Sequence, residues 1–190
     1  MAKARPIPGL SASDPYASAA AKIVEVRVGE VIDLARGVLD TGDIERVHDM
    51  RVATRRLRAA LEIFEPCFPR GELKSGLRQV KALADALGER RDRDVAIAAL
   101  EDIGAAMAAP DRPGIETLVA RLREEQATAN ESLARFVRED HLVPLCEQLT
   151  ELVTAARPLP VNGAIPAEAA EMEAQEPAEN GAERAAGGRV

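Results

Sequence analysis

The sequence predicts an all-α fold: an antiparallel helical bundle of five to six helices followed by an acidic tail. Alanine, leucine and long charged residues dominate the chain, whereas aromatic residues make up 2% of it. This composition favours helices over sheets. Apolar residues recur at helical spacing in several segments. One stretch, "IVEVRV" (23–28), alternates as a strand would, but its flanks favour helix.

Helix boundaries follow from the capping and breaking residues. We expect a disordered lead over 1–13 and helices over about 15–39, 44–65, 72–87, 90–109 and 113–140, with a last segment to about 156. Pro15 suits the first position of the first helix, and Gly88 suits the C-cap of the third. Pro144 is expected to interrupt the chain before the last segment.

The predicted helical domain therefore covers 14–157, and residues 158–190 differ from it in composition. This tail is rich in Pro, Ala, Glu and Gly, and it holds six glutamates against two arginines. Too few apolar residues remain to bury a core, so we expect the tail to be disordered. An acidic regulatory or solubilising role and a tail without function both stay open.

Charge is distributed unevenly along the chain. The net charge is −7, yet residues 51–93 hold 11 Lys or Arg against 6 Asp or Glu, which leaves a balance of +5 there and −12 elsewhere. A basic centre within an acidic chain indicates a localised anion site, because general nucleic-acid binders are usually basic overall.

The second predicted helix carries a basic stripe. When residues are placed about 100° apart, four basic residues share one face: His48, Arg51, Arg55 and Arg58. Four apolar residues occupy the opposite face: Met50, Leu57, Leu61 and Phe64. Arg56 lies off the stripe. This helix should therefore pack into the bundle with one face and present cations with another.

The third predicted helix repeats this arrangement. Its apolar stripe consists of Leu73, Leu77, Val80, Ala84 and Leu87. A second stripe beside it consists of Lys74, Arg78, Lys81 and Asp85. If the two helices are neighbours, their basic stripes border one groove. Three further arginines stand near the start of the fourth predicted helix, where the helix dipole also attracts anions: Arg90, Arg91 and Arg93.

The alternative interpretation is that these basic residues form solvated faces with local ion pairs. Five acidic residues are close enough in sequence to neutralise several arginines: Asp49, Glu62, Asp85, Asp92 and Asp94.

The ligand that best matches two basic stripes is a linear, densely charged anion, because arginine forms bidentate bonds with phosphate oxygens. Single-stranded nucleic acid would need aromatic stacking platforms, and the basic block offers Phe64 and Phe68 alone. Base reading in duplex DNA would need Asn or Gln, which "RVATRRLR" lacks. We therefore do not expect nucleic acid as a partner, and polyphosphate fits the charge without requiring base contacts.

The remaining reactive residue types indicate no metal or cofactor site. His48 is either an anion donor or a capping or core residue, and we assign His141 to structure. Cys67 and Cys146 match no metal spacing and are expected to be free thiols. We find no secretory signal and no apolar run long enough to span a bilayer, so we expect a cytoplasmic protein without a membrane partner.

Two segments resemble a known family, the conserved histidine α-helical domain (CHAD). The segment "VHDMRVATRRLRAALEIF" is similar to the family's His-x-x-Arg-Val-x-x-Arg-Arg-Leu-Arg signature, which is specific. The segment "LGERRDRDVAIAAL" is similar to its Gly-x-x-Arg-Asp-x-Asp-Val segment, which is supportive. With the helical layout, the resemblance covers roughly Asp14 to Ala156.

The resemblance implies an all-helical fold, inorganic polyphosphate as ligand and no catalysis. It also implies an association with polyphosphate or polyhydroxybutyrate granules. Carried over by motif, the ligand-facing residues would be His48, Arg51, Arg55, Arg58, Arg91 and Arg56. The periodicity of the third helix adds Lys74, Arg78 and Lys81.

The chain departs from the family pattern in one respect. Members usually have two similar bundles around a basic channel, each with its own His-x-x-Arg helix, and this chain has one such helix. Either a second copy completes the channel in a homodimer, or the protein is a half-site that binds weakly.

Two other functions compete with polyphosphate binding. The alternative from another class is a helical scaffold or granule-associated interaction protein whose arginines are structural. A phosphohydrolase lacks the carboxylate cluster and metal spacing that it would need. No triphosphate-enzyme motif of alternating glutamates precedes the domain, so we expect no enzyme activity.

Overall fold

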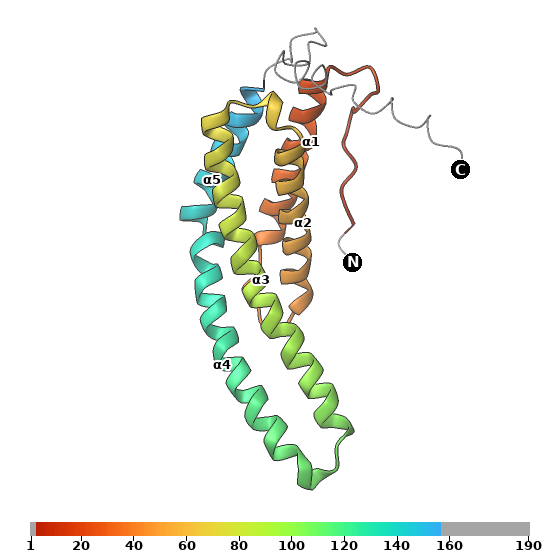
Figure 1. The fold of residues 1–190 in the computed structure, drawn as a ribbon, viewed down its shortest axis with the longest axis vertical. Helices are drawn as coiled ribbons and strands as arrows, with labels where there is room; N and C mark the ends of the chain where they lie inside the picture. Colours follow the sequence, from red (N-terminus) through yellow and green to blue (C-terminus); the bar gives the residue numbers. More distant parts are fainter. Residues whose placement is uncertain (1–2, 157–190) are drawn as a thin grey trace, which may run out of the picture. The chain divides into compact units, whose positions relative to one another are not determined.

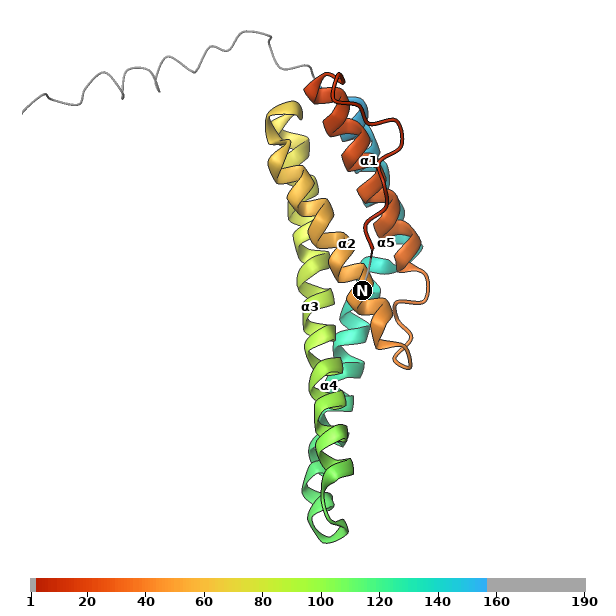
Figure 2. The same ribbon diagram turned by 90° about the vertical axis from the view of Figure 1, so that its right-hand side faces the viewer.

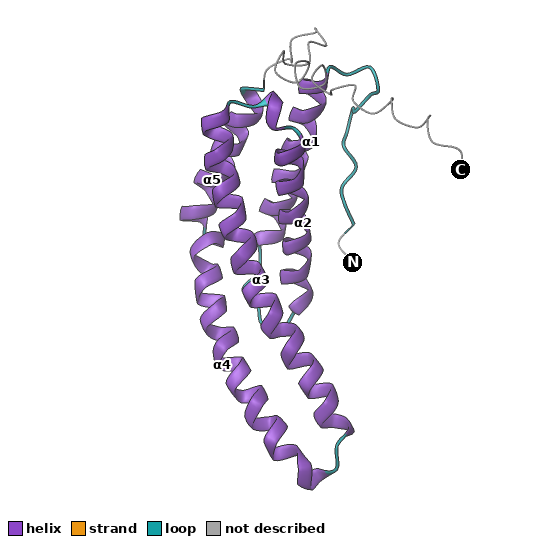
Figure 3. Cartoon of the chain, viewed as in Figure 1, coloured by secondary structure: helices purple, strands orange, loops and turns teal. Residues whose placement is uncertain are grey.

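The computed structural model describes residues 3–156, and the predicted tail lies outside the described residues. The described part contains five α-helices and two short 3-10 turns, joined by loops (Figures 1 and 3). They are α1 (Tyr16–Ala35), α2 (Ile44–Ile63), η1 (Glu65–Cys67), α3 (Arg70–Ala106), η2 (Ala109–Asp111), α4 (Arg112–Val137) and α5 (Glu139–Thr154). The predicted all-α fold is confirmed.

Four helical segments surround the main core. Helix α1 packs on α2 and α5, and the first half of α3 packs on the same two helices from the other side. Figure 2 shows α2 and α3 side by side, with α1 and α5 across the core from them. The second half of α3 continues past this region and pairs with α4 as a long hairpin (Figure 1).

The apolar stripes predicted from sequence form the core. Of the predicted face of α2, Met50, Leu57 and Leu61 are buried and Phe64 is half-buried. The stretch 23–28 is helical, with Val24 and Val28 buried against the bundle. Burying a side chain of this size stabilises the fold by on the order of 1.5–3 kcal/mol, which outweighs the strand preference of the valines.

Local signals explain where α1 ends and α2 begins. Helix α1 stops at Ala35 rather than at the predicted Leu39, because Gly37 has a φ of 76° that leaves the helical region. The Asp43 side chain accepts a hydrogen bond from the backbone N–H of Glu45 at 3.2 Å, which caps α2. Residues 3–13 are not helical, and Arg5 is paired with Asp33 of α1 at 2.6 Å.

The prediction of separate third and fourth helices was wrong. Residues 70–106 form one continuous helix, α3, and Gly88 lies inside it rather than at a C-cap. A glycine inside a helix costs about 1 kcal/mol relative to alanine, and the flanking Leu83, Leu87 and Ile97 more than offset this cost because they are buried. The predicted helix start near Arg90, with its dipole, therefore does not exist.

The prediction that Pro144 interrupts the chain was also wrong. Pro144 lies inside α5, and the break falls instead at Arg138, between α4 and α5. Proline cannot donate to the carbonyl of Asp140, but Asp140 and Pro144 are both exposed, so water can satisfy that carbonyl. Four buried leucines of α5 hold the helix together: Leu142, Leu145, Leu149 and Leu152.

Replacing Gly88 by alanine should stabilise the protein. An alanine Cβ at this position meets nothing within 4 Å, and the backbone is helical. We therefore expect the free energy of unfolding to rise by about 0.5–1 kcal/mol, measured by urea unfolding.

Gly37→Ala is the matched control for this substitution. Because Gly37 has a φ of 76°, Gly37→Ala should lower the free energy of unfolding by roughly 1 kcal/mol. A loss of stability for Gly88→Ala would show that α3 is broken at this point.

The two cysteines of the chain are both free thiols. Cys67 is buried and Cys146 is half-buried. Burial and the neighbouring Glu147 raise the pKa of Cys146 to about 11.

Among the described residues, no helix is both long and apolar enough to cross a membrane.

Candidate functional site

Helices α2 and α3 run antiparallel, and the contacts between them fix their register. The Arg91 guanidinium donates to the backbone carbonyl of Ile44 at 3.0 Å, so these two residues lie at the same level. At the other end, η1 brings the start of α3 level with the end of α2. Between these points, Arg51 lies at about the level of Ala84, and Arg58 at about the level of Leu77.

Contacts with the other helices show which flank of α2 faces α3. The side of α2 that holds Arg46 and Phe64 faces α1: Arg46 donates to the carbonyl of Arg36 at 3.4 Å, and Phe64 contacts the Tyr16 ring at 5.3 Å between centroids. The opposite flank therefore faces α3. At about 100° per residue, Arg51 and Arg58 lie on this flank, whereas Arg56 lies toward α1.

Contacts with α5 and α2 likewise show where the cations of α3 lie. Gly76 contacts Leu149, and Gln79 donates to Gln148 at 2.5 Å, so this side of α3 faces α5. Arg91 reaches α2 from the other side. Lys74 and Lys81 lie between that α2-facing side and solvent. The basic stripes of the two helices thus border the same α2–α3 seam.

The pairing of these cations separates two groups. Arg58 is paired with Glu62 at 2.7 Å, and Arg91 with Glu45 at 3.6 Å. Within the described chain, five of the predicted arginines and lysines have neither an ion pair nor a side-chain hydrogen bond: Arg51, Arg55, Lys74, Arg78 and Lys81. Arg51 is half-buried and the other four are exposed. These five cations can accept a mobile anion without first breaking an internal contact.

Sequence reasoning missed one further cation, Arg70. It is the first residue of α3, is exposed, and has no ion pair within residues 3–156. It stands four residues before Lys74, on the same face of the helix. The predicted helix began at Glu72, which left Arg70 in the connection; extending the basic spacing backwards by one turn would have found it. We call Arg70, Arg51, Arg55, Lys74, Arg78 and Lys81 the basic strip.

Elsewhere on the described fold, several cations are paired with a nearby carboxylate. Examples are Arg5 with Asp33, Lys22 with Asp14, Arg27 with Glu30, Arg46 with Asp43 and Arg123 with Glu101, all within 3.0 Å. On the strip, the expected neutralisation by nearby acids is incomplete. Asp85 and Asp92 form no ion pair with an arginine in the part of the chain that the structure describes.

His48 lies at the acidic end of the seam. It is half-buried, and ligand atoms of Glu45, His48 and Asp49 lie within 4.8 Å of one another. One buried carboxylate oxygen of Asp49 has no hydrogen-bond partner within the described chain. Two carboxylates beside the imidazole oppose anion binding at this point, so the strongest attraction for an anion lies further along the seam, from Arg51 to Arg70.

Arg90 and Arg93, predicted beside Arg91, have structural contacts. Arg90 is fully buried and donates to Asp94 at 2.7 Å, and Gln126 of α4 donates to the other oxygen of Asp94 at 2.6 Å. Burial lowers the pKa of Arg90 and raises the pKa of Asp94. Arg93 donates to the backbone carbonyl of Glu89 at 3.1 Å. Of this predicted cluster, Arg91 alone reaches α2.

Comparison with known proteins agrees with the resemblance seen in the sequence. The family model described as CHAD domain matches residues 22–187. No curated protein matches the chain.

Proposed function

The chain belongs to the CHAD-domain family, and from this premise we propose that it binds inorganic polyphosphate, or a similar linear polyanion, without catalysis. The family is associated with polyphosphate binding in general and is generally non-catalytic. The observation that carries the proposal is the basic strip: six cations that have no carboxylate partner in the described chain, five of them beside the α2–α3 seam and the sixth, Arg78, on the neighbouring solvent face of α3.

The chemistry of the strip favours phosphate over other anions. Guanidinium groups form two parallel hydrogen bonds with phosphate oxygens, and lysines add point charges. Because the cations are exposed, each contact contributes modestly, and affinity has to come from many contacts at once. A ligand with a charge on every repeat meets this requirement.

A scaffold whose arginines are structural is the competing function, and it accounts for some residues. It explains Arg58, Arg90 and Arg91, which are paired within the fold. It does not explain why the six cations of the strip stand close together on α2 and α3 without partners. Six like charges close together destabilise a fold slightly, so this arrangement requires another reason.

The proposal is tested by titrating the full chain, at a measured mass, with long-chain polyphosphate, heparin and single-stranded DNA. We expect polyphosphate to bind tightest. Its affinity should fall on the order of a hundredfold between about 50 and 200 mM salt, because four or five phosphates would displace counterions. Affinity that is insensitive to salt, or equal for all three polymers, would contradict polyphosphate binding by the strip.

The measured mass addresses the expected homodimer. A second copy would bring a second basic strip. We propose that one chain supplies half of a basic channel and that the second copy supplies the other half. We then expect one long polyphosphate molecule to bind for every two copies of the protein.

A further inference from the structure

We infer that Arg91 is a positioning residue of the anion site: it holds the start of α2 in register with α3 and does not itself contact the ligand. The family motif would instead place Arg91 among the ligand-facing residues. The inference rests on the proposed function and adds how the two halves of the basic strip, one on α2 and one on α3, are kept together.

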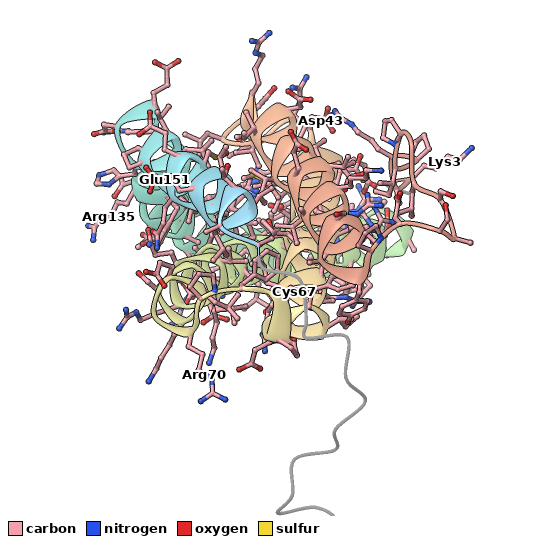
Figure 4. The ribbon with its side chains drawn as sticks, turned by 90° about the horizontal axis from the view of Figure 1, so that it is seen from above. Lys3, Asp43, Cys67, Arg70, Arg135 and Glu151 are labelled. Carbon is pink, nitrogen blue, oxygen red and sulfur yellow. The ribbon has the colours of Figure 1, made fainter. Side chains whose placement is uncertain are left out.

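Both terminal nitrogens of Arg91 contact the first turn of α2. Nη1 donates to the backbone carbonyl of Ile44 at 3.0 Å, and Nη2 lies 3.6 Å from a carboxylate oxygen of Glu45. The Arg91 side chain is 19% exposed. By contrast, Figure 4 shows the side chain of Arg70, a member of the strip, at the edge of the bundle and directed into solvent. A phosphate would have to displace Ile44 or Glu45 before it could bind the same nitrogens of Arg91.

Of these two contacts, the hydrogen bond to Ile44 is the one that fixes the position of α2. The Glu45 side chain is 60% exposed and its distance from Arg91 is long, so water screens this ion pair and it contributes little. The Ile44 carbonyl belongs to the backbone, so it cannot leave Arg91 unless α2 itself moves. The bond to Ile44 therefore restrains the whole helix, whereas the pair with Glu45 restrains one side chain.

This hydrogen bond lies on the flank of α2 that faces α3 and carries the strip. Ile44, Arg51 and Arg58 stand seven residues apart, which is close to two helical turns, so they share one side of α2. Arg55 lies about one turn beyond Arg51. A rotation or a sliding of α2 that broke the contact between Arg91 and Ile44 would therefore carry Arg51 and Arg55 away from the cations of α3.

The other polar side chains of α3 do not make an equivalent link to α2. Within residues 3–156, those that form hydrogen bonds or ion pairs contact α4, α5 or α3 itself. The apolar contacts between α2 and α3 bury more surface, but the hydrophobic effect is not directional. Arg91 thus supplies the directional contact that sets how the two basic stripes lie against each other.

The test is a double-variant cycle on polyphosphate affinity. The unchanged full chain, Arg91→Gln, Arg51→Gln/Arg55→Gln and the combined variant are titrated with long-chain polyphosphate at one low salt concentration, and circular dichroism checks that each is folded. Arg91→Gln alone should weaken binding about tenfold, because Arg51 and Arg55 lose most of the roughly fivefold that each contributes. When Arg51 and Arg55 are already glutamine, Arg91→Gln should change the affinity less than about twofold.

Arg93→Gln is the matched control, because Arg93 is a nearby half-buried arginine without a contact to α2. It donates to the backbone carbonyl of Glu89 and lies 3.9 Å from Glu125 of α4. Its replacement should leave the affinity within about twofold. Arg91→Lys is a second variant for the same cycle, should Arg91→Gln not fold. It keeps the charge but loses the planar guanidinium that reaches Ile44 and Glu45 together, so it should also weaken binding.

A direct contact between Arg91 and the ligand would give different results. In that case Arg91→Gln would weaken binding equally with and without Arg51 and Arg55, and the inference would be wrong. An affinity unchanged by Arg91→Gln, or fully preserved by Arg91→Lys, would overturn it too. If the unchanged chain does not bind polyphosphate at all, the proposed function fails and the inference fails with it.

Discussion

Replacing Arg51, Arg55, Lys74 and Lys81 together by glutamine should weaken the binding of long-chain polyphosphate by a few hundredfold. Each exposed charge-assisted hydrogen bond contributes about 1 kcal/mol, or about a factor of five, and the four side chains act on one ligand. The salt dependence should fall as well, by about one unit of log–log slope for each phosphate that the variant no longer neutralises. Titration of both proteins at several salt concentrations measures the two effects.

A control variant with the same change in net charge separates the strip from general electrostatics. Four exposed cations on other parts of the fold serve this purpose: Arg36, Arg121, Arg135 and Arg138. Their replacement by glutamine should change polyphosphate affinity less than about fivefold, because distant exposed charges are screened. Equal reductions in affinity for the two variants would show that net charge, and not the α2–α3 seam, binds the polymer.

The helices and their buried faces could be predicted from sequence because both follow from local periodicity. The apolar residues of α2 and the first half of α3 repeat at helical spacing, and the structure buries most of them, with Phe64, Leu77 and Ala84 half-buried. The same periodicity predicted the basic stripes. Placing the two stripes on one seam required one further assumption, that a short connection makes α2 and α3 antiparallel neighbours, and their packing bears it out.

The continuity of α3 could not be predicted from the same local signals. Gly88 and the arginines after it have the pattern of a helix end followed by a helix start. Local sequence gives only helix propensities, and these differ by about 1 kcal/mol. Packing decides the outcome. Helix α4 lies along the second half of α3 and buries Ile97 and Asp94 of α3, and a break at Gly88 would expose those side chains.

The pairing of individual arginines could not be predicted from sequence either. Arg58 and Arg90 each stand four residues before an acidic residue, so their spacing does not distinguish them. In the fold, Arg58 is 43% exposed beside Glu62, whereas Arg90 has no exposed surface beside Asp94. Burial is a property of the surrounding helices, which is why sequence alone grouped Arg90 with the anion-binding cluster.

Removing Arg90 should destabilise the fold more than any other arginine substitution proposed for this chain. In Arg90→Met, the Asp94 carboxylate stays buried with Gln126 as its remaining polar partner. An uncompensated buried charge costs about 3–5 kcal/mol, so the midpoint of thermal unfolding should fall by roughly 10 °C. Thermal and urea unfolding followed by circular dichroism measure the destabilisation.

Arg58→Met is the matched control, because Arg58 and Glu62 form a pair of the same spacing and the same 2.7 Å distance at the surface. It should cost less than about 1 kcal/mol. The double variant Arg90→Met/Asp94→Leu should recover most of the stability, since it removes both buried charges and the two guanidinium nitrogens that have no hydrogen-bond partner within residues 3–156. If the single Arg90 variant were as stable as the Arg58 variant, Asp94 would have to reach solvent, and the packing of α3 against α4 would be looser than the buried pair requires.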